Sequence, residues 1–376
     1  MFKNIFKNYL YPSAVLSGSI IGVGFLSLPF ITLKVGIFAM VFYFVILTIL
    51  VTCVHLMFAQ ICLKTPDFKR WPGFVEFYFG PLAKKIVLIS MVAGGYGVLL
   101  LYLIVGSQFL AIMLNPWFGG TTLVYLLLYF IGASAIIHFG VSAVSKVSFW
   151  ALIIFGVLLI GIFLTGYTHL NLNSVFAQST PVLFDWKTIF LPYGAILFSL
   201  WGTGLIPEVE EMLRDRKKIF KKVVIIGTLI PVLIYILFIF LILSISGSQT
   251  TESALIGLKD FLGSKIIFTA FLIGFITTFT ASISQGLLLK KVFIYDVGLS
   301  GFPALVFTCF PPLMIFLLGF NSFISLISFI GGFLLGIDGI LIILMYQKIY
   351  GRKIIFYPLM LIFVLGIIYQ IAFFIK

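Results

Sequence analysis

Charged residues are scarce in this 376-residue chain, and no long polar segment separates its apolar ones. Charged side chains make up 9% of the sequence and hydrophobic ones 62%. Apolar runs of about 20 residues, the length that a hydrocarbon core requires, recur from one end to the other. A soluble domain with so much apolar surface would aggregate, and the runs lack the alternation of a membrane β-barrel. The composition therefore predicts a polytopic α-helical membrane protein.

Cysteine and catalytic constellations are also sparse. The three cysteines, Cys53, Cys62 and Cys309, lie in or beside apolar runs and form no CxxC pair, so neither a disulfide framework nor a zinc site is predicted. There are three histidines and no HExxH or GxGD motif. A membrane-embedded enzyme needs a nucleophile or a metal constellation. An enzyme is therefore kept only as the alternative to a transporter, and no cofactor or metal is expected.

The apolar runs predict eleven membrane spans. Two lysines precede the first span without a small-residue cleavage site, so this span is predicted to be retained rather than removed as a signal. The predicted spans lie at residues 12–33, 36–62, 83–113, 121–139, 146–167, 187–213, 221–246, 262–291, 301–319, 321–347 and 354–375.

The basic residues predict an orientation. With a cytoplasmic N-terminus, all but five of the 24 lysines and arginines fall on the inner side, as the positive-inside rule requires. The C-terminus is then outside. The same asymmetry accounts for the net charge of +13, and the cluster "RDRKKIFKK" at 214–222 is predicted to contact lipid headgroups and not nucleic acid. The short loops favour a prokaryotic inner membrane. The five outer residues are Lys34, Lys187, Lys259, Lys265 and Lys376.

Two of the predicted spans carry helix breakers in their middle. The first contains "SGSIIGVGFLSLPF" at 17–30, and the sixth reads "LPYGAILFSLWGTGLIPEVEEML" at 191–213. If five helices are followed by five more, the breaks occupy matching positions in two inverted halves. Paired Gly/Pro-interrupted spans of this kind indicate a transporter binding site. The competing interpretation is that the glycines serve close helix packing.

These stretches resemble a known family. "GSIIGVGFLSLPF" resembles the first-helix signature of the amino acid–polyamine–organocation (APC) superfamily. The sixth span with its basic loop, and "LLLKKVFIYD" after the eighth, are similar to the amino acid/auxin permease and aromatic amino acid permease branches. The resemblance implies a LeuT-type fold with repeats at 12–167 and 187–347 and an extra helix at 354–375. It implies a secondary amino acid transporter driven by Na⁺ or H⁺, with a different organic solute as the alternative substrate.

The resemblance places a zwitterionic substrate at the two breaks. Half-helix N-termini offer N–H groups to a carboxylate, and half-helix C-termini offer carbonyls to an ammonium group. An aromatic lid and glycine-rich walls favour an aromatic or hydrophobic amino acid. The expected donors are Gly22, Val23, Gly24 and Phe25; the expected acceptors are Ile20, Ile21, Phe198, Ser199 and Leu200; and Trp201, Gly202 and Tyr96 complete the predicted pocket.

The coupling ion is left open between Na⁺ and H⁺. Hydroxyls at helical spacing in the eighth span would suit Na⁺, although hydroxyls in membrane helices commonly bond back to carbonyls of their own helix. The intramembrane acids Glu208 and Asp338 are the proton candidates. His55 and His138 are predicted to be structural. The sodium candidates are Gly18 and Ile21 in the first span, and Thr277, Thr280 and Ser284 in the eighth.

Overall fold

The computed structural model describes residues 6–67, 69–166, 175, 190–213, 216–252, 254–255, 264–319 and 327–374. The described part is helical and contains no strand. Several positions of the charge pattern lie outside these residues, and so does one predicted end of each of the fifth, sixth, eighth, tenth and eleventh spans. Those charged positions are Lys3, Lys187, Arg214, Lys259 and Lys376.

Each predicted span coincides with a helix or with a pair of shorter helices. In the described residues, seven helices are long and apolar enough to cross a membrane, and one bent pair makes up to eight. The remaining spans are shorter apolar helices or the broken sixth span. The continuous helices are α4 (Ile37–Lys64), α6 (Pro81–Phe118), α7 (Thr122–Phe139), α8 (Val141–Gly166), α13 (Lys217–Ser246), α14 (Ser264–Tyr295), α15 (Gly301–Leu317), α17 (Leu335–Tyr350, preceded by the π-helical turn Ile330–Leu334) and α18 (Phe356–Phe374).

The first span is broken where its glycines predict. Helix α2 (Tyr11–Ile20) is followed by Ile21, whose backbone is extended at φ −73° and ψ 91°. A 3₁₀ turn (Val23–Ser27) leads into α3 (Leu28–Val35), and the two halves are bent by 54°. Pro29 lies in the first turn of α3, where its missing N–H is tolerated.

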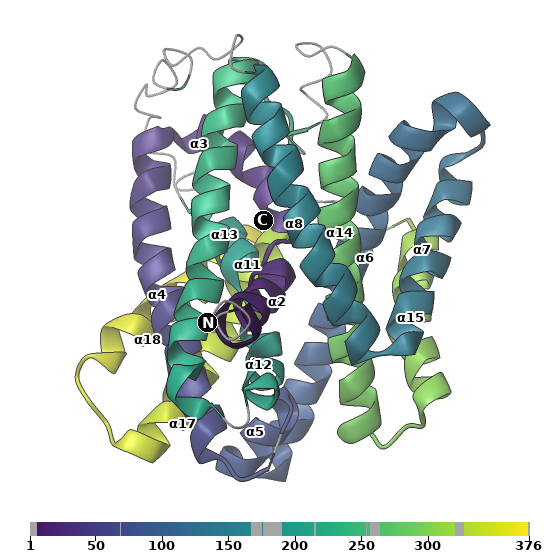
Figure 1. Ribbon diagram of the computed structural model, residues 1–376. Helices are drawn as coiled ribbons and strands as arrows, with labels where there is room; N and C mark the ends of the chain where they lie inside the picture. The colour runs from purple at the N-terminus through teal and green to yellow at the C-terminus, as the bar shows by residue number, and fades with distance from the viewer. Residues whose placement is uncertain are drawn as a thin grey trace.

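The sixth span is broken in the same way. Helix α11 (Leu191–Leu200) is followed by Trp201, whose backbone is extended at φ −75° and ψ 119°. A single 3₁₀ turn (Thr203–Leu205) then leads into α12 (Ile206–Met212), again with a proline in its first turn. In Figure 1, α3 and α12 lie toward opposite ends of the molecule, so the second halves of the two broken spans point in opposite directions.

The broken spans are surrounded by the continuous helices. Helix α13 packs against α2 and α4, and α14 packs against α6, α7 and α8. Helix α11 contacts the 3₁₀ turn of the first span as well as α4, so the two breaks meet inside the bundle. The short helix α5 (Trp71–Phe79), which the sequence analysis did not predict, follows α4 and packs on α6 at the same end of the molecule as α12 (Figure 1).

Candidate functional site

A cavity of about 150 Å³ lies between the two helix breaks. Its walls come from both breaks and from α4, α5, α6, α14 and α17. Among the predicted site residues, those lining it are Ile20, Gly22, Gly24, Phe198, Ser199, Trp201, Gly202, Ser284 and Asp338. The unwound backbone of both spans therefore faces a cavity, which is the setting in which irregular backbone is tolerated inside a membrane.

Glycine is required in the first break because neighbouring atoms approach it closely. A Cβ at position 24 would lie 2.5 Å from Ser199 Oγ, and a Cβ at position 22 would lie 2.6 Å from Tyr102 Oη. Real Cβ atoms do not make such contacts, so a side chain at position 24 would displace Ser199 and Phe198, and one at position 22 would displace Tyr102.

The carbonyls at the ends of α2 and α11 share one partner. Tyr235 Oη on α13 lies 3.0 Å from the Ile20 carbonyl and 2.9 Å from the Ser199 carbonyl. Its single proton is donated to one of them at a time, so the Tyr235 hydroxyl joins the two C-terminal ends. The ring is fully buried and stacks on Phe25 at a centroid distance of 5.5 Å. Two of the predicted ammonium acceptors thus already contact a protein donor.

Trp201 presents an aromatic ring to the cavity at the sixth-span break. It packs edge-to-face against His55 of α4 at 6.1 Å and against Phe363 of α18 at 6.3 Å, measured between ring centroids. His55 also contacts the break itself, since its Nε2 accepts the Gly202 backbone N–H at 3.1 Å. Neither His55 nor Phe363 lines the cavity.

The structure places Tyr96 outside the cavity wall. Its hydroxyl donates to the Phe307 carbonyl of α15 at 2.8 Å and does not line the cavity. Tyr102 of the same helix lines it instead. Six residues correspond to about 120° of rotation around an α-helix, so the two tyrosines face different directions. Tyr96 was included in the predicted pocket because glycines flank it in the sequence. Two of these glycines, Gly94 and Gly95, do line the cavity.

The hydroxyl stripe on α14 follows the alternative interpretation at two of its three positions. Thr277 donates to the Ile273 carbonyl at 3.0 Å, and Thr280 to the Ile276 carbonyl at 2.9 Å, so both bond within their own helix. Ser284 lines the cavity, and its Oγ lies 3.4 Å from Ser148 Oγ of α8. A Cβ on Gly18 would contact the Ser148 carbonyl at 3.3 Å, which places the first span beside the same serine.

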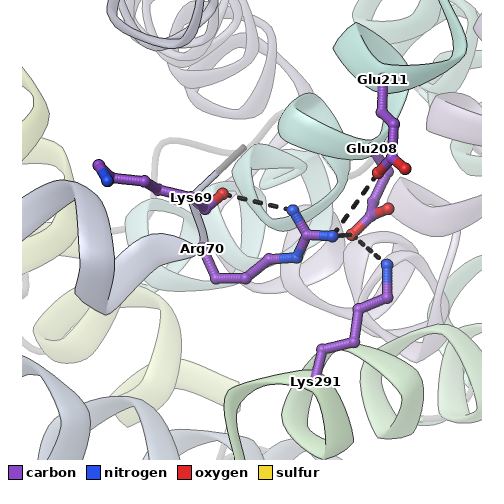
Figure 2. Close-up of polar contacts among 5 residues, drawn as sticks. All are labelled: Lys69, Arg70, Glu208, Glu211 and Lys291. Carbon is purple, nitrogen blue, oxygen red and sulfur yellow. Dashed lines mark hydrogen bonds and ion pairs between the residues drawn. The ribbon is translucent and has the colours of Figure 1, made fainter. Parts of the chain in front are cut away.

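Glu208 lies in a charged cluster at the end of the molecule that carries α5 and α12. Figure 2 shows its carboxylate between two cations: Lys291 Nζ of α14 lies 2.6 Å from Glu208 Oε1, and Arg70 Nη2 lies 3.0 Å from it. Arg70 also reaches Glu211 at 3.7 Å. Arg70, Glu208 and Lys291 are all buried. The cluster therefore ties the α4–α5 connection, α12 and α14 together.

A second ionic group flanks this cluster. Lys84 Nζ lies 2.7 Å from Glu76 and 3.8 Å from Asp296, which directly follows α14. Burial raises the pKa of the Asp296 carboxyl, and the positive charge of Lys84 opposes that shift.

Asp338 differs from Glu208 in its partner. Its Oδ1 accepts the indole N–H of Trp71 at 3.0 Å, and both residues line the cavity. Within the described residues, no lysine, arginine or histidine forms an ion pair with Asp338. No group of three or more His, Cys, Asp or Glu side chains that would hold a metal occurs in this part of the chain.

The remaining predicted residues lie behind the cavity wall. Several polar or aromatic wall residues were not predicted, because the local sequence does not show which face of a helix turns toward the cavity. The predicted residues outside the lining are Gly18, Ile21, Val23, Phe25, Tyr96, Leu200, Glu208, Thr277 and Thr280. The lining residues that sequence reasoning missed include Phe58, Arg70, Trp71, Ser90, Tyr102 and Gln285.

Comparison with known proteins now identifies the chain. Residues 7–254 match the Tryptophan/tyrosine permease family. The chain belongs to this family. A permease is a transporter, so the geometry described above belongs to a secondary amino acid transporter in a membrane, and the alternative of a membrane-embedded enzyme is set aside. No curated protein sequence matches the chain.

Solved structures show that the Tryptophan/tyrosine permease chain has the LeuT-type fold. It is similar to MhsT in complex with L-phenylalanine, with a TM-score of 0.62, 15% identity, and coverage of 97% of this chain and 98% of that one. It is also similar to Mhp1, a nucleobase-cation-symport-1 family transporter in a closed conformation with bromovinylhydantoin bound. There the TM-score is 0.69 at 12% identity, covering 96% of this chain and 90% of that one.

Proposed function

We propose that the chain is an APC-superfamily symporter that carries aromatic amino acids across a prokaryotic inner membrane together with protons. The observation that carries the substrate class is the cavity between the two breaks, which combines unwound backbone with the Trp201 and Phe198 rings. The family description names tryptophan and tyrosine, and MhsT, a structure with the same fold, holds L-phenylalanine.

The substrate backbone is recognised by main-chain groups. The first N–H groups of a helix lack partners and carry the positive end of its dipole, which suits a carboxylate. The half-span from Val23 to Val35 begins at the cavity, and the Tyr102 hydroxyl lies beside Gly22. The ammonium group is directed to the carbonyl ends of α2 and α11, where the Tyr235 hydroxyl lies within hydrogen-bond distance of the Ile20 and Ser199 carbonyls.

Asp338 is the proposed proton carrier. A charged carboxylate inside hydrocarbon is costly unless it is paired. Glu208 is paired with Arg70 and Lys291, whereas Asp338 faces the cavity with an indole N–H as its partner. Of the residues predicted to hold Na⁺, only Ser284 lines the cavity, whereas Asp338 lines it without a paired cation among the described residues, and this favours H⁺ over Na⁺.

The membrane orientation is part of the same proposal, with the N-terminus inside and the C-terminus outside. Arg70, Lys84 and Lys291 gather at the end of the molecule that carries α5 and α12. The exposed lysines at the start of α13 suit anionic lipid headgroups at this inner face. Those lysines are Lys217, Lys218, Lys221 and Lys222.

The deciding experiment is uptake by proteoliposomes of labelled L-tryptophan, L-tyrosine, L-phenylalanine and L-leucine. Sodium or choline is placed outside, each with and without an inward proton gradient. We expect the aromatic amino acids to accumulate when the proton gradient is present, whichever cation is outside. Accumulation that requires sodium would overturn proton coupling, and failure of every amino acid to move would overturn the substrate class.

The Asp338→Asn variant tests the proton carrier directly. Asparagine keeps the acceptor for the Trp71 N–H but cannot exchange a proton, so we expect gradient-driven accumulation to be lost while substrate exchange continues. Asp67→Asn is the matched control, because Asp67 is 87% exposed. An Asp338→Asn protein that still accumulates substrate against its gradient would assign the proton to another group.

A further inference from the structure

His55 is the one fully buried histidine in the described part of the chain, and it lies outside the cavity wall. It is on α4, the second span. Both of its ring nitrogens contact other spans: Nε2 the break of the sixth span, and Nδ1 the Thr228 hydroxyl of α13 at 2.9 Å. A buried histidine needs hydrogen-bond partners, and because both partners here belong to other spans, the ring joins α4 to the sixth-span break and to α13.

The partners fix the protonation of the ring. A backbone N–H can only donate, so Nε2 must carry a lone pair toward Gly202 at 3.1 Å. The ring is then neutral, with its proton on Nδ1 donated to Thr228 Oγ1. The Thr228 hydroxyl in turn donates a hydrogen bond to the Val224 carbonyl at 2.9 Å. Every donor in this chain of hydrogen bonds has an acceptor.

The contact satisfies a group that the helix break has freed. Unwinding at Trp201 and Gly202 removes backbone N–H groups from the helical ladder, and each such group is expensive to leave unpaired inside a membrane. His55 supplies the missing acceptor at Gly202. Its ring also packs on Trp201, so one side chain contacts two consecutive residues of the break.

We propose that His55 is a positioning residue of the substrate site, which holds the sixth-span break unwound and sets Trp201 against the cavity before substrate binds. The proposal rests on the proposed function for the identity of the substrate. His55 does not touch the substrate. His55 accepts the hydrogen bond from the Gly202 N–H, so this N–H is not free to bind the substrate carboxylate. The carboxylate is therefore directed to the N–H groups of the first break.

The test compares His55→Leu with His55→Gln in the full-length protein. Leucine fills the space without an acceptor, whereas the glutamine amide oxygen reaches the position of Nε2. Hydrogen–deuterium exchange of the Gly202 amide reports the contact without any ligand, and binding of labelled L-tryptophan reports the site. His138→Leu is the control, since that histidine is exposed at the end of α7.

We expect His55→Leu to exchange the Gly202 amide faster and to bind L-tryptophan roughly tenfold more weakly, as for a buried donor left unpaired. His55→Gln should restore both measurements, and His138→Leu should match the wild type. A His55→Leu protein with wild-type exchange and affinity would overturn the proposal, and so would a His55→Gln protein as impaired as His55→Leu.

Thr228 offers a second route if His55→Leu does not fold. Thr228→Val removes the acceptor for Nδ1–H with little change of shape, so the buried Nδ1–H is left unpaired and the ring is no longer held against Gly202. Exchange at Gly202 should rise in Thr228→Val and stay unchanged in Thr228→Ser. Equal exchange in both variants would contradict the role of the Thr228 hydroxyl in holding the His55 ring against Gly202.

The two readouts separate this inference from the proposed function. If wild-type protein binds none of the aromatic amino acids, the proposed substrate class fails. The exchange rate of the Gly202 amide in the variants then decides the role of His55 by itself, because that measurement needs no substrate.

Discussion

At the scale of single residues, the site depends on atoms that approach more closely than side chains allow. Gly24 of the first break lies against Ser199 and Phe198 at the end of α11, and its absent Cβ would be 2.5 Å from Ser199 Oγ. The close approach brings the two unwound segments to one cavity. Gly156 of α8, by contrast, has open space where a Cβ would lie.

Gly24→Ala should therefore damage both stability and binding. Overpacking of this kind costs about 1–3 kcal/mol of stability. We therefore expect Gly24→Ala to have a lower melting temperature than the wild type and to bind L-tryptophan more weakly than Gly156→Ala does. Gly156→Ala adds the same atom in a helix without a clash and should change stability by at most about 1 kcal/mol. Thermal unfolding and ligand binding of both variants, measured in detergent, check this. Equal behaviour would mean that the breaks move apart freely.

At the scale of elements, Glu208 holds the second half of the sixth span in place. Helix α12 is only seven residues long, and its Glu208 carboxylate is shared by Lys291 of α14 and Arg70 of the α4–α5 connection (Figure 2). Removing one partner of such a buried group leaves the others uncompensated, and the free-energy loss exceeds what the intact pair contributes. Any conformational change that separates α12 from α14 must break these contacts.

Glu208→Gln should destabilise the protein by about 3–5 kcal/mol, because two buried cations then face a neutral amide. Glu211→Gln is the matched control: its side chain is 53% exposed and lies 3.7 Å from Arg70, so the expected change is below about 1 kcal/mol. Melting temperatures of the two variants in the same detergent test this. A destabilisation in Glu211→Gln as large as that in Glu208→Gln would contradict the assigned role of the buried carboxylate.

At the scale of the whole molecule, the basic residues predict which end of the helix bundle faces the cytoplasm. The turn between α6 and α7 lies at the opposite end of the molecule from α5 and α12 (Figure 1). Lysines and arginines gather at the α5 end, which is therefore predicted to be cytoplasmic.

Cysteine labelling in whole cells tests the orientation. The three native cysteines are first replaced by alanine. Thr121→Cys lies in the exposed turn before α7 and should react with a membrane-impermeant maleimide added outside. Lys353→Cys lies in the exposed turn before α18 and should react only after the cells are opened. The reverse pattern would invert the topology.

Most of the fold could be predicted from the sequence, because span length and helix breaking are local properties. Apolar runs predicted where helices cross, and the Gly and Pro residues predicted the breaks at Gly22 and Gly202, which the structure confirms. The division into repeats at 12–167 and 187–347 stays a prediction, because most of the residues that join the halves lie outside the described ranges.

The sequence by itself determined a membrane protein with two opposed helix breaks, because hydrocarbon leaves few choices for backbone hydrogen bonds. The tertiary structure alone decided which side chains meet those breaks. Tyr102 in place of Tyr96, the Tyr235 hydroxyl on two carbonyls and His55 on Gly202 depend on how whole helices are rotated and packed. These contacts join residues 147 and 215 positions apart, and no local pattern encodes such pairs.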